Sequence, residues 1–170
     1  FENADLFNQD IGDWDVSNGT SFRFMFYEAE RFNQDIGDWD VSSGTKFSYM
    51  FDSAKSFNQD IGDWDVSSGT DFKGMFYENL AFNQNLKYWD VSSSASLEQM
   101  FDGADKMLAN GWVETPSKSD FNKTRITNRS QLDTAIDLWI SDENSAISTY
   151  GDINTWDVSA ITDFSNLFSI

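Results

Sequence analysis

A 25-residue sequence is repeated four times in tandem, and this repetition limits the folds available to the chain. The copies begin at Phe7, Phe32, Phe57 and Phe82, and the first three share the string FNQDIGDWDVS without a change. The fourth, FNQNLKYWDVS, has diverged, and a partial fifth copy, YGDINTWDVSAITDFSNLFSI, begins at Tyr150. One such copy is too short to enclose a core of its own, so neighbouring copies are expected to stack.

Two kinds of apolar spacing follow one another within each copy. Trp14 and Val16 lie two residues apart, which is typical of a strand. Four apolar residues then follow at i, i+3, i+4 and i+7, which is typical of one face of a short helix. They are Phe22, Met25, Phe26 and Ala29. The spacing therefore predicts an α/β solenoid, a stack of coils that each hold a short strand and a short helix.

Stacking would place equivalent residues of successive copies in columns. The apolar columns contain Phe, Ile, Trp, Val and Met, and we expect them to form one continuous core. One polar column is predicted to form an asparagine ladder, whose amides satisfy backbone groups that the coil leaves unpaired. It consists of Asn8, Asn33, Asn58 and Asn83.

The points at which the repeat pattern breaks predict four segments. Residues 1–103 form a four-coil array whose first coil is incomplete, and residues 104–129 form a loop-rich insertion with the only proline. Residues 130–149 hold a helix, SQLDTAIDLWI, and a turn, and this helix is expected to cap the exposed end of the stack. Residues 150–170 begin a further coil.

Composition excludes several classes of function. Lys and Arg total 11 against 29 Asp and Glu, for a net charge of −18, so the chain would repel nucleic acid and anionic membranes. It has no Cys and no His, which excludes disulfides, thiolate catalysis and Ser-His-Asp triads. Pairs of carboxylates could suggest a glycosidase, but identically repeated acids lack the two different environments that such a pair needs. We therefore expect no enzyme, no nucleic-acid partner and no membrane insertion.

The string FNQDI-x-x-WDVS-x-x-T-x-x-x-x-MF resembles the repeat of the DUF285 or BspA-like leucine-rich repeat family of bacterial surface proteins. The resemblance covers residues 1–102 and 150–168. It implies a leucine-rich-repeat-like stack, an extracellular or cell-surface location, a role in adhesion or surface structure, and no catalytic residues. The segment that begins with SQLDTAIDLW resembles the start of such an array, where a helix precedes the first coil.

The chain departs from the family pattern in two neighbouring columns. The usual valine after WDVS-x is replaced by Gly19, Gly44 and Gly69, then by Ser94, and only Ile161 keeps an aliphatic residue. The usual methionine three residues later is a phenylalanine at Phe22, Phe47, Phe72 and Phe164. A small residue beside an enlarged one is consistent with volume compensation in a packed interior. The alternatives are a groove or a close backbone approach.

The two ends of the sequence lie in the same phase of the repeat. Phe1 and Phe168 both have the phase of Phe26, so the chain ends in the first part of a coil and begins with the rest of one. One interpretation is an arbitrary boundary. The other is that terminal half-coils join head to tail, within one polypeptide or between subunits, into a fibre or long surface array. The lack of an initiator methionine and of a signal peptide predicts a mature or excised chain.

The fibre interpretation predicts an assembly interface whose partners are copies of the chain. Its residues would be Phe1, Leu6 and Phe7 at one end and Trp156, Val158, Phe164, Leu167 and Phe168 at the other. The alternative is a monomeric cell-surface adhesion module that binds a glycan or a protein on one face of the stack. Such a module should have closed caps at both ends and a pocket that departs from the repeat.

Three aspartate columns are candidate calcium ligands: Asp10, Asp13, Asp15, Asp35, Asp38, Asp40, Asp60, Asp63 and Asp65. Stacked carboxylates about 5 Å apart repel one another, and calcium, which takes six to eight oxygen ligands, would offset that repulsion. The alternative is that the Asp15 column bonds turn backbone while the Asp13 column is solvated. Sequons at Asn18, Asn122 and Asn128 predict glycosylation if the source is a eukaryotic secretory pathway.

Overall fold

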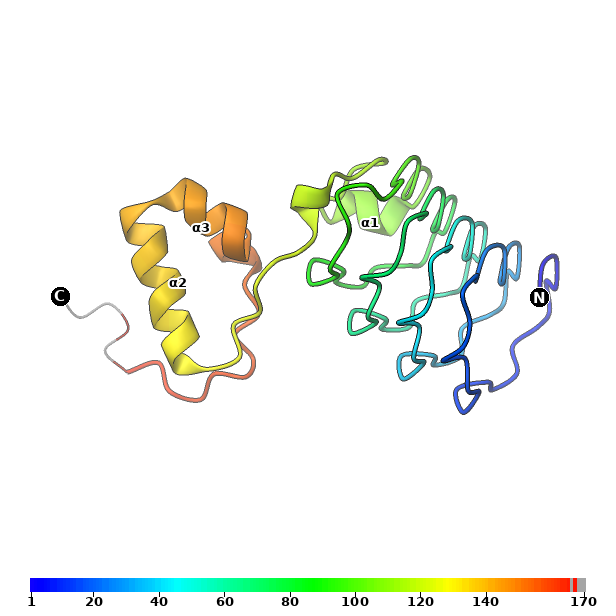
Figure 1. Ribbon diagram of the computed structural model, residues 1–170, viewed down its shortest axis with the longest axis horizontal. Helices are drawn as coiled ribbons and strands as arrows, with labels where there is room; N and C mark the ends of the chain where they lie inside the picture. The colour runs from blue at the N-terminus through cyan, green and yellow to red at the C-terminus, as the bar shows by residue number, and fades with distance from the viewer. Residues whose placement is uncertain (166, 168–170) are drawn as a thin grey trace. The chain divides into compact units, whose positions relative to one another are not determined.

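The computed structural model describes residues 1–165 and residue 167. The chain forms two compact units, unit 1 (Phe1–Phe121) and unit 2 (Asn122–Ile170). In unit 1 the successive repeats form coils that lie side by side (Figure 1, blue to green). Unit 1 also contains α1 (Asp105–Ala109) and the 3-10 helix η1 (Lys118–Asp120). Unit 2 contains α2 (Arg129–Ser141), α3 (Glu143–Tyr150) and the 3-10 helix η2 (Ile153–Thr155).

The predicted α/β solenoid is wrong, because the coils of residues 1–103 contain neither a helix nor a sheet. They consist of turns and extended links, with three isolated parallel bridges. These bridges are Ser21–Lys46, Lys46–Asp71 and Asp71–Ser96. The strand-plus-helix coil of a leucine-rich-repeat-like architecture is therefore absent from this stack of turn-built coils.

The backbone amides of the segment that was expected to be helical alternate between two uses. Every second N–H donates to a carbonyl of the next coil, as Phe24 does to Ser48 at 3.2 Å. The same bond, at 2.8 to 2.9 Å, is made by Phe22, Phe26 and Glu28. The intervening amides close local turns, as Met25 does on Phe22 at 3.1 Å. An α-helix needs consecutive amides to bond four residues back, so it cannot form while alternate amides are used between coils.

Two residues in each coil also have a left-handed backbone. In the first coil these are Phe24 and Glu28, with φ of 57° and 54°. The same conformation recurs at Tyr49 and Ser53, Gly74 and Glu78, and Gln99 and Gly103. A left-handed residue interrupts a right-handed helix, so two successive turns replace it. These turns still bury Phe22, Phe26 and Ala29, which explains why the apolar spacing imitated a helix.

The segment that was expected to be a strand lies between two turns. The Trp14 amide bonds the Ile11 carbonyl at 3.1 Å, and the Gly19 amide bonds the Val16 carbonyl at 2.7 Å. Coils are linked here by tryptophan side chains instead of a backbone ladder. Each indole N–H donates to an isoleucine carbonyl of the preceding coil, in the pairs Trp39–Ile11, Trp64–Ile36 and Trp89–Ile61, at 3.0 to 3.1 Å.

The predicted asparagine ladder is confirmed. The side-chain oxygens of Asn8, Asn33 and Asn58 accept the backbone N–H of the asparagine 25 residues further on, at 2.8 to 2.9 Å. A glutamine column that the sequence did not single out reinforces it, because the Gln34 amide donates to both the backbone and side-chain oxygens of Asn8. Gln59 and Gln84 repeat these contacts.

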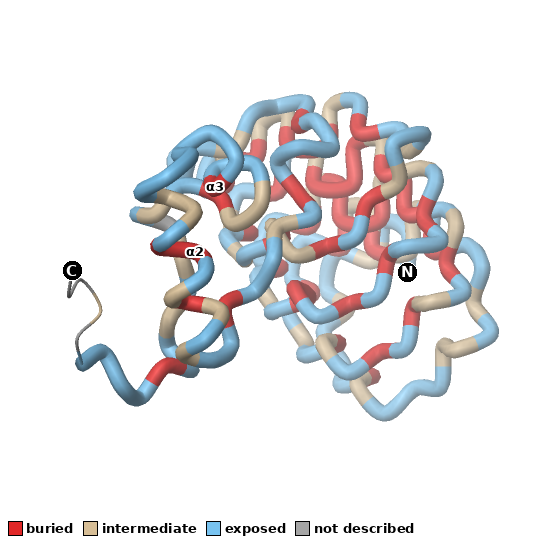
Figure 2. The backbone as a smooth tube through the Cα atoms, turned by 60° about the vertical axis from the view of Figure 1, so that its left-hand side comes forward, coloured by how far each residue is buried: buried red, intermediate tan, exposed pale blue. Residues whose placement is uncertain are grey.

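Aromatic side chains make up much of the core of unit 1, in which buried residues recur along successive coils (Figure 2, red). Phe32, Phe57 and Phe82 stack in a column with centroids 5.8 to 5.9 Å apart. The glycine column shows both volume compensation and the alternative of a close backbone approach, because a Cβ added at Gly44 would also lie 2.8 Å from the Val41 carbonyl oxygen. A Cβ added at Gly44 would lie 2.5 Å from the Phe47 ring, and one at Gly19 would lie 2.7 Å from the Phe22 ring. The phenylalanine therefore occupies the space that the glycine leaves, and no groove opens there.

Unit 2 has a small core of its own. The helix predicted over SQLDTAIDLWI is present as α2, which buries Leu132, Ala135 and Ile136 together with Ile126 and Ile161. Asn128 caps the start of α2, because its side chain accepts the Gln131 N–H at 3.0 Å. The predicted capping of the repeat stack by this helix stays a prediction.

Candidate functional site: the open and closed ends of the stack

One edge of unit 1, formed by its first coil, exposes apolar side chains. We define this open edge by Phe1, Leu6, Phe7 and Trp14. Leu6 is 72% exposed and Phe1 is 39% exposed, and the Phe1 ring stacks on Phe7 with centroids 3.9 Å apart. The predicted interface residues Phe1, Leu6 and Phe7 are therefore brought together at this edge, and the structure adds Trp14 to them.

The exposed fraction of Trp14 shows how much of this edge is left uncovered. Its side chain is 48% exposed, whereas Trp39 and Trp64 in the same column are each 4% exposed and Trp89 is 1% exposed. The acceptor for each buried indole N–H lies 28 residues earlier in the sequence. No residue of this sequence corresponds to that acceptor for Trp14. The ring is thus missing both the cover and the carbonyl that a preceding coil supplies elsewhere in the column.

The opposite end of the stack is closed by residues 104–121, which supply some of the bonds that a next coil would make. The Phe101 amide donates to the Glu114 carbonyl at 2.9 Å, where the equivalent Phe76 amide donates to Met100. The Gln99 amide donates to the hydroxyl of Thr115 at 2.9 Å. The side-chain amide of Asn110 donates to the Asn83 oxygen and ends the asparagine ladder. We call residues 104–121 the closing segment.

Aromatic side chains of the closing segment complete the core. The Trp112 ring meets Phe101 edge-on with centroids 5.1 Å apart, and Phe121 stacks on Trp89 at 6.5 Å. Met107 and Phe121 are buried. The sequence analysis missed this role and assigned residues 104–129 to a loop-rich insertion. The signal available was a set of large apolar residues, Met107, Leu108, Trp112 and Phe121, within a polar segment.

Residues 153–161 of unit 2 reproduce the turn geometry of residues 11–19 in unit 1. Trp156 bonds Ile153 and Ile161 bonds Val158 through backbone atoms, at 3.4 and 2.9 Å, as Trp14 and Gly19 do in the first coil. Trp156, Val158 and Leu167 are half-buried against the core of unit 2, and Phe164 is 50% exposed. Phe168, the remaining predicted interface residue, lies outside the described residues.

The aspartate columns mainly hold turns together. The carboxylates of Asp10, Asp35 and Asp60 each accept the N–H of the glycine two residues later, at 2.9 to 3.0 Å. Asp15, Asp40 and Asp65 accept the N–H of the following serine at 3.0 to 3.1 Å. Hydrogen bonds from the serine hydroxyl and backbone lower the pKa of these three carboxyls below its usual value. Asp13, Asp38 and Asp63 are exposed.

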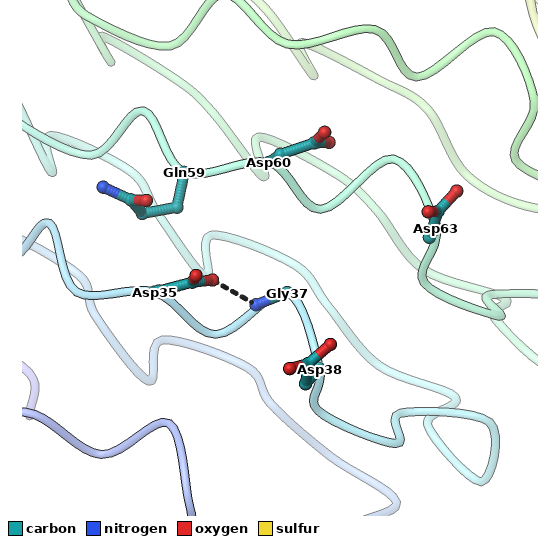
Figure 3. Close-up of a pocket in the computed structure, with 6 residues that line it drawn as sticks. All are labelled: Asp35, Gly37, Asp38, Gln59, Asp60 and Asp63. Atoms are coloured by element: carbon teal, nitrogen blue, oxygen red, sulfur yellow. Dashed lines mark hydrogen bonds between the residues drawn. The ribbon is translucent and has the colours of Figure 1, made fainter. Parts of the chain in front are cut away.

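Calcium finds no preformed ligand set at these columns. Among residues 1–165 and 167, no group of three or more Asp, Glu, His or Cys side chains is placed to hold a metal ion. Asp35, Asp38, Asp60 and Asp63 do line a shallow pocket between two coils (Figure 3). In that pocket the Asp35 carboxylate already accepts the Gly37 N–H at 2.9 Å. These contacts agree with the alternative to calcium binding, in which the carboxylates accept hydrogen bonds from turn backbone or face the solvent.

The sequons and the surface tyrosines fall at separate places. Asn18, Asn122 and Asn128 are all exposed, and Asn128 also caps α2. Tyr49 stacks on Phe24 of the preceding coil with centroids 5.2 Å apart and 6° between planes. The Tyr49 ring is therefore used in packing one coil against the next, which does not favour its use as a platform on which a sugar ring stacks.

A stack of turn-built coils with one open and one closed end defines a tandem-repeat protein. The family described as "Mycoplasma protein of unknown function, DUF285" matches residues 1–114 and 138–170, and the chain belongs to this family. No curated protein and no solved structure matches the chain significantly. Within the described part of the chain, none of the helices is both long and apolar enough to cross a membrane.

Proposed function

We propose that this protein is a structural unit that is extended by adding a further repeat coil at the open edge of unit 1, to give a fibre or long surface array. The observation that carries the proposal is the Trp14 column, where Trp39, Trp64 and Trp89 are buried and Trp14 is half-exposed. A preceding coil would bury Trp14, Phe1 and Phe7 in the manner already seen between coils, because their column equivalents Trp39, Phe26 and Phe32 are buried. Burying a large apolar side chain contributes roughly 1.5–3 kcal/mol, so this edge favours association.

The proposed location is outside the cell or at its surface. The resemblance of the repeats to BspA-like bacterial surface proteins supports this location. The uniform columns of unit 1 support an architectural role over catalysis, because the repeated acids of one column share one environment. An adhesion module that acts as a monomer is the competing function, and it is favoured if the open edge stays unoccupied in solution.

The test is electron microscopy and light scattering of the purified chain over a range of concentrations. We expect filaments or multimers that become scarcer in the Trp14→Ala variant. Leu80→Ala is the matched control, because Leu80 is another exposed apolar residue of unit 1 but is not part of the open edge. A chain that is monomeric at every concentration, or an equal loss of multimers in both variants, would overturn the proposal.

A further inference from the structure

Resting on the proposed function, we propose that the coil which occupies the open edge is residues 150–165 of a second copy of this chain, in a register set by the Trp and Thr columns. In this register the indole N–H of Trp14 donates to the Ile153 carbonyl of the other copy. The Thr20 N–H and hydroxyl donate to the Thr162 carbonyl of the other copy. The junction then repeats the contacts that join two coils within unit 1.

The donors of the open edge determine what the partner must offer. Within unit 1 the Thr45 N–H and hydroxyl donate to the Thr20 carbonyl, at 2.9 and 3.0 Å, and Thr70 repeats this pattern on Thr45. Thr20 begins the column, so its own N–H and hydroxyl face the side on which a preceding coil would lie. The partner must therefore present a carbonyl at the Thr position and another at the Ile position of a repeat.

Residues 153–161 already have the turn geometry of a repeat coil, and they include Ile153 and are followed directly by Thr162. Ile153 accepts the Trp156 N–H as Ile11 accepts that of Trp14, and Asp157 accepts the Ser159 N–H as Asp15 accepts that of Ser17. Arg129, the first residue of α2, fixes the end of this coil by donating to the Ser165 carbonyl at 2.8 Å. Unit 2 thus holds this coil in shape through contacts within unit 2.

The exposures of the two coils are complementary. In the first coil of unit 1, Phe22 is buried although only a following coil covers it, and Trp14 is exposed for lack of a preceding coil. In unit 2 the column partner of Phe22 is Phe164, which is 50% exposed. The open edge therefore has room for a preceding coil, and residues 150–165 have room for a following one. A head-to-tail contact between two copies meets both needs at once.

The junction differs from an internal contact in one column. Tyr150 stands where the repeats have the ladder asparagine, so the amide of Asn8 receives no side-chain oxygen from the other copy. Two aspartates, Asp152 and Asp157, would also face Asp10 and Asp15 across the junction. We therefore expect a contact that is weaker than an internal one and that strengthens with salt, which screens the like charges.

Single cysteines test this register, because the chain contains no native cysteine. Adjacent coils place equivalent Cα atoms about 5 Å apart, within the range that a disulfide can bridge. Thr20→Cys protein is mixed with Thr162→Cys protein at micromolar concentration and oxidised. The control mixes Thr45→Cys with Thr162→Cys, since the neighbours of Thr45 in its column are already in place within unit 1.

We expect heterodimer to form about a thousandfold faster in the Thr20→Cys mixture than in the control, because pairing raises the local thiol concentration from micromolar to about millimolar. Equal rates in the two mixtures would overturn this register. If light scattering of the unmodified chain still shows multimers in that case, the proposed function stands and only this choice of partner coil fails. If the unmodified chain is also monomeric, both proposals fail.

Discussion

The first two coils of unit 1 share an identical string, FNQDIGDWDVS, over residues 7–17 and 32–42, yet they are buried to different extents. Phe32 and Trp39 lie in the core, whereas Phe7 is half-buried and Trp14 is half-exposed. Both copies make the same local turns, with the aspartate side chain bonded two residues ahead. The local conformation of a coil is therefore set by its own sequence, and its burial is set by its neighbour.

Alanine at the two tryptophans gives the largest expected difference between the coils. Trp39→Ala should lower the free energy of unfolding of unit 1 by about 3–5 kcal/mol, because it empties a core site and removes a buried hydrogen bond. Trp14→Ala should cost about 1 kcal/mol or less, as for a surface position. Urea unfolding followed by tryptophan fluorescence measures both. Equal costs would contradict the view that the neighbouring coil determines burial.

A larger residue in the glycine column should separate packing from backbone effects. Gly44→Val places methyl groups in the space that the Phe47 ring occupies, and overpacking of this kind costs about 1–3 kcal/mol. The second change Phe47→Met should restore the part of that loss that comes from the ring, but not the part that comes from the Val41 carbonyl, which a Cβ at Gly44 would approach to 2.8 Å. The thermal midpoints of both single variants and the double variant measure the coupling. A double variant that loses the sum of the two single losses would argue against compensation.

Asp52 should make the interior of the stack less stable as pH rises. Burial raises the pKa of its carboxyl to about 6, and the charges of Glu78 and Glu28 add to this rise against a hydrogen bond from Ser53. The unfolded chain therefore loses this proton first, and the stability of the native state falls between about pH 4 and pH 6. Asp52→Asn should gain about 1–2 kcal/mol at pH 8 and almost nothing below pH 4.

Asp40 is the control of opposite sign for this pH dependence. Its pKa is lowered by hydrogen bonds from Ser42, so its stabilising effect is present at neutral pH and fades as acid protonates the carboxylate. Asp40→Asn should therefore destabilise the protein slightly at pH 7 and not at low pH. Denaturation curves across the pH range compare the two variants. A parallel response of both variants would contradict the assigned directions.

The smallest expected effect is that of calcium on the aspartate columns. Addition of about millimolar CaCl2, a concentration that saturates many extracellular calcium modules, should change the thermal midpoint no more than MgCl2 at equal ionic strength. General screening of the acidic surface is expected from both salts. A rise that is specific to calcium and is reversed by EDTA would restore the calcium interpretation of these columns.

The sequence predicted correctly those features that follow from the chemistry or the size of a repeated side chain. The asparagine column predicted its ladder because an amide oxygen can accept the N–H of the next coil, and the Gly–Phe pair predicted compensation because their volumes complement each other. It failed on secondary structure because the spacing of Phe22, Phe26 and Ala29 is compatible both with a helix and with two turns. Only the inter-coil hydrogen bonds distinguish the two, and a single repeat does not reveal them.

The candidate site was recovered in part from the sequence. Phe1, Leu6 and Phe7 were predicted at the open edge, but Trp14 was not, because its column looked uniform. The closing segment was missed because it imitates a coil without sharing its sequence. It does so through the side-chain amide of Asn110, the backbone carbonyl of Glu114 and the hydroxyl of Thr115. A segment that replaces a coil in this way cannot be recognised from the repeat pattern of the sequence.

The alternation of amides between local turns and the next coil has an evolutionary consequence. Because each coil meets the next through the same offsets, removing or duplicating one whole repeat brings together surfaces that already fit. The hydrogen bonds of the closing segment to Asn83, Gln99 and Phe101 join it to the last coil, so the same bonds would seal a longer or a shorter stack. Slippage in the coding DNA that preserves the repeat can therefore change the length of the stack in one event, with no compensating substitution elsewhere.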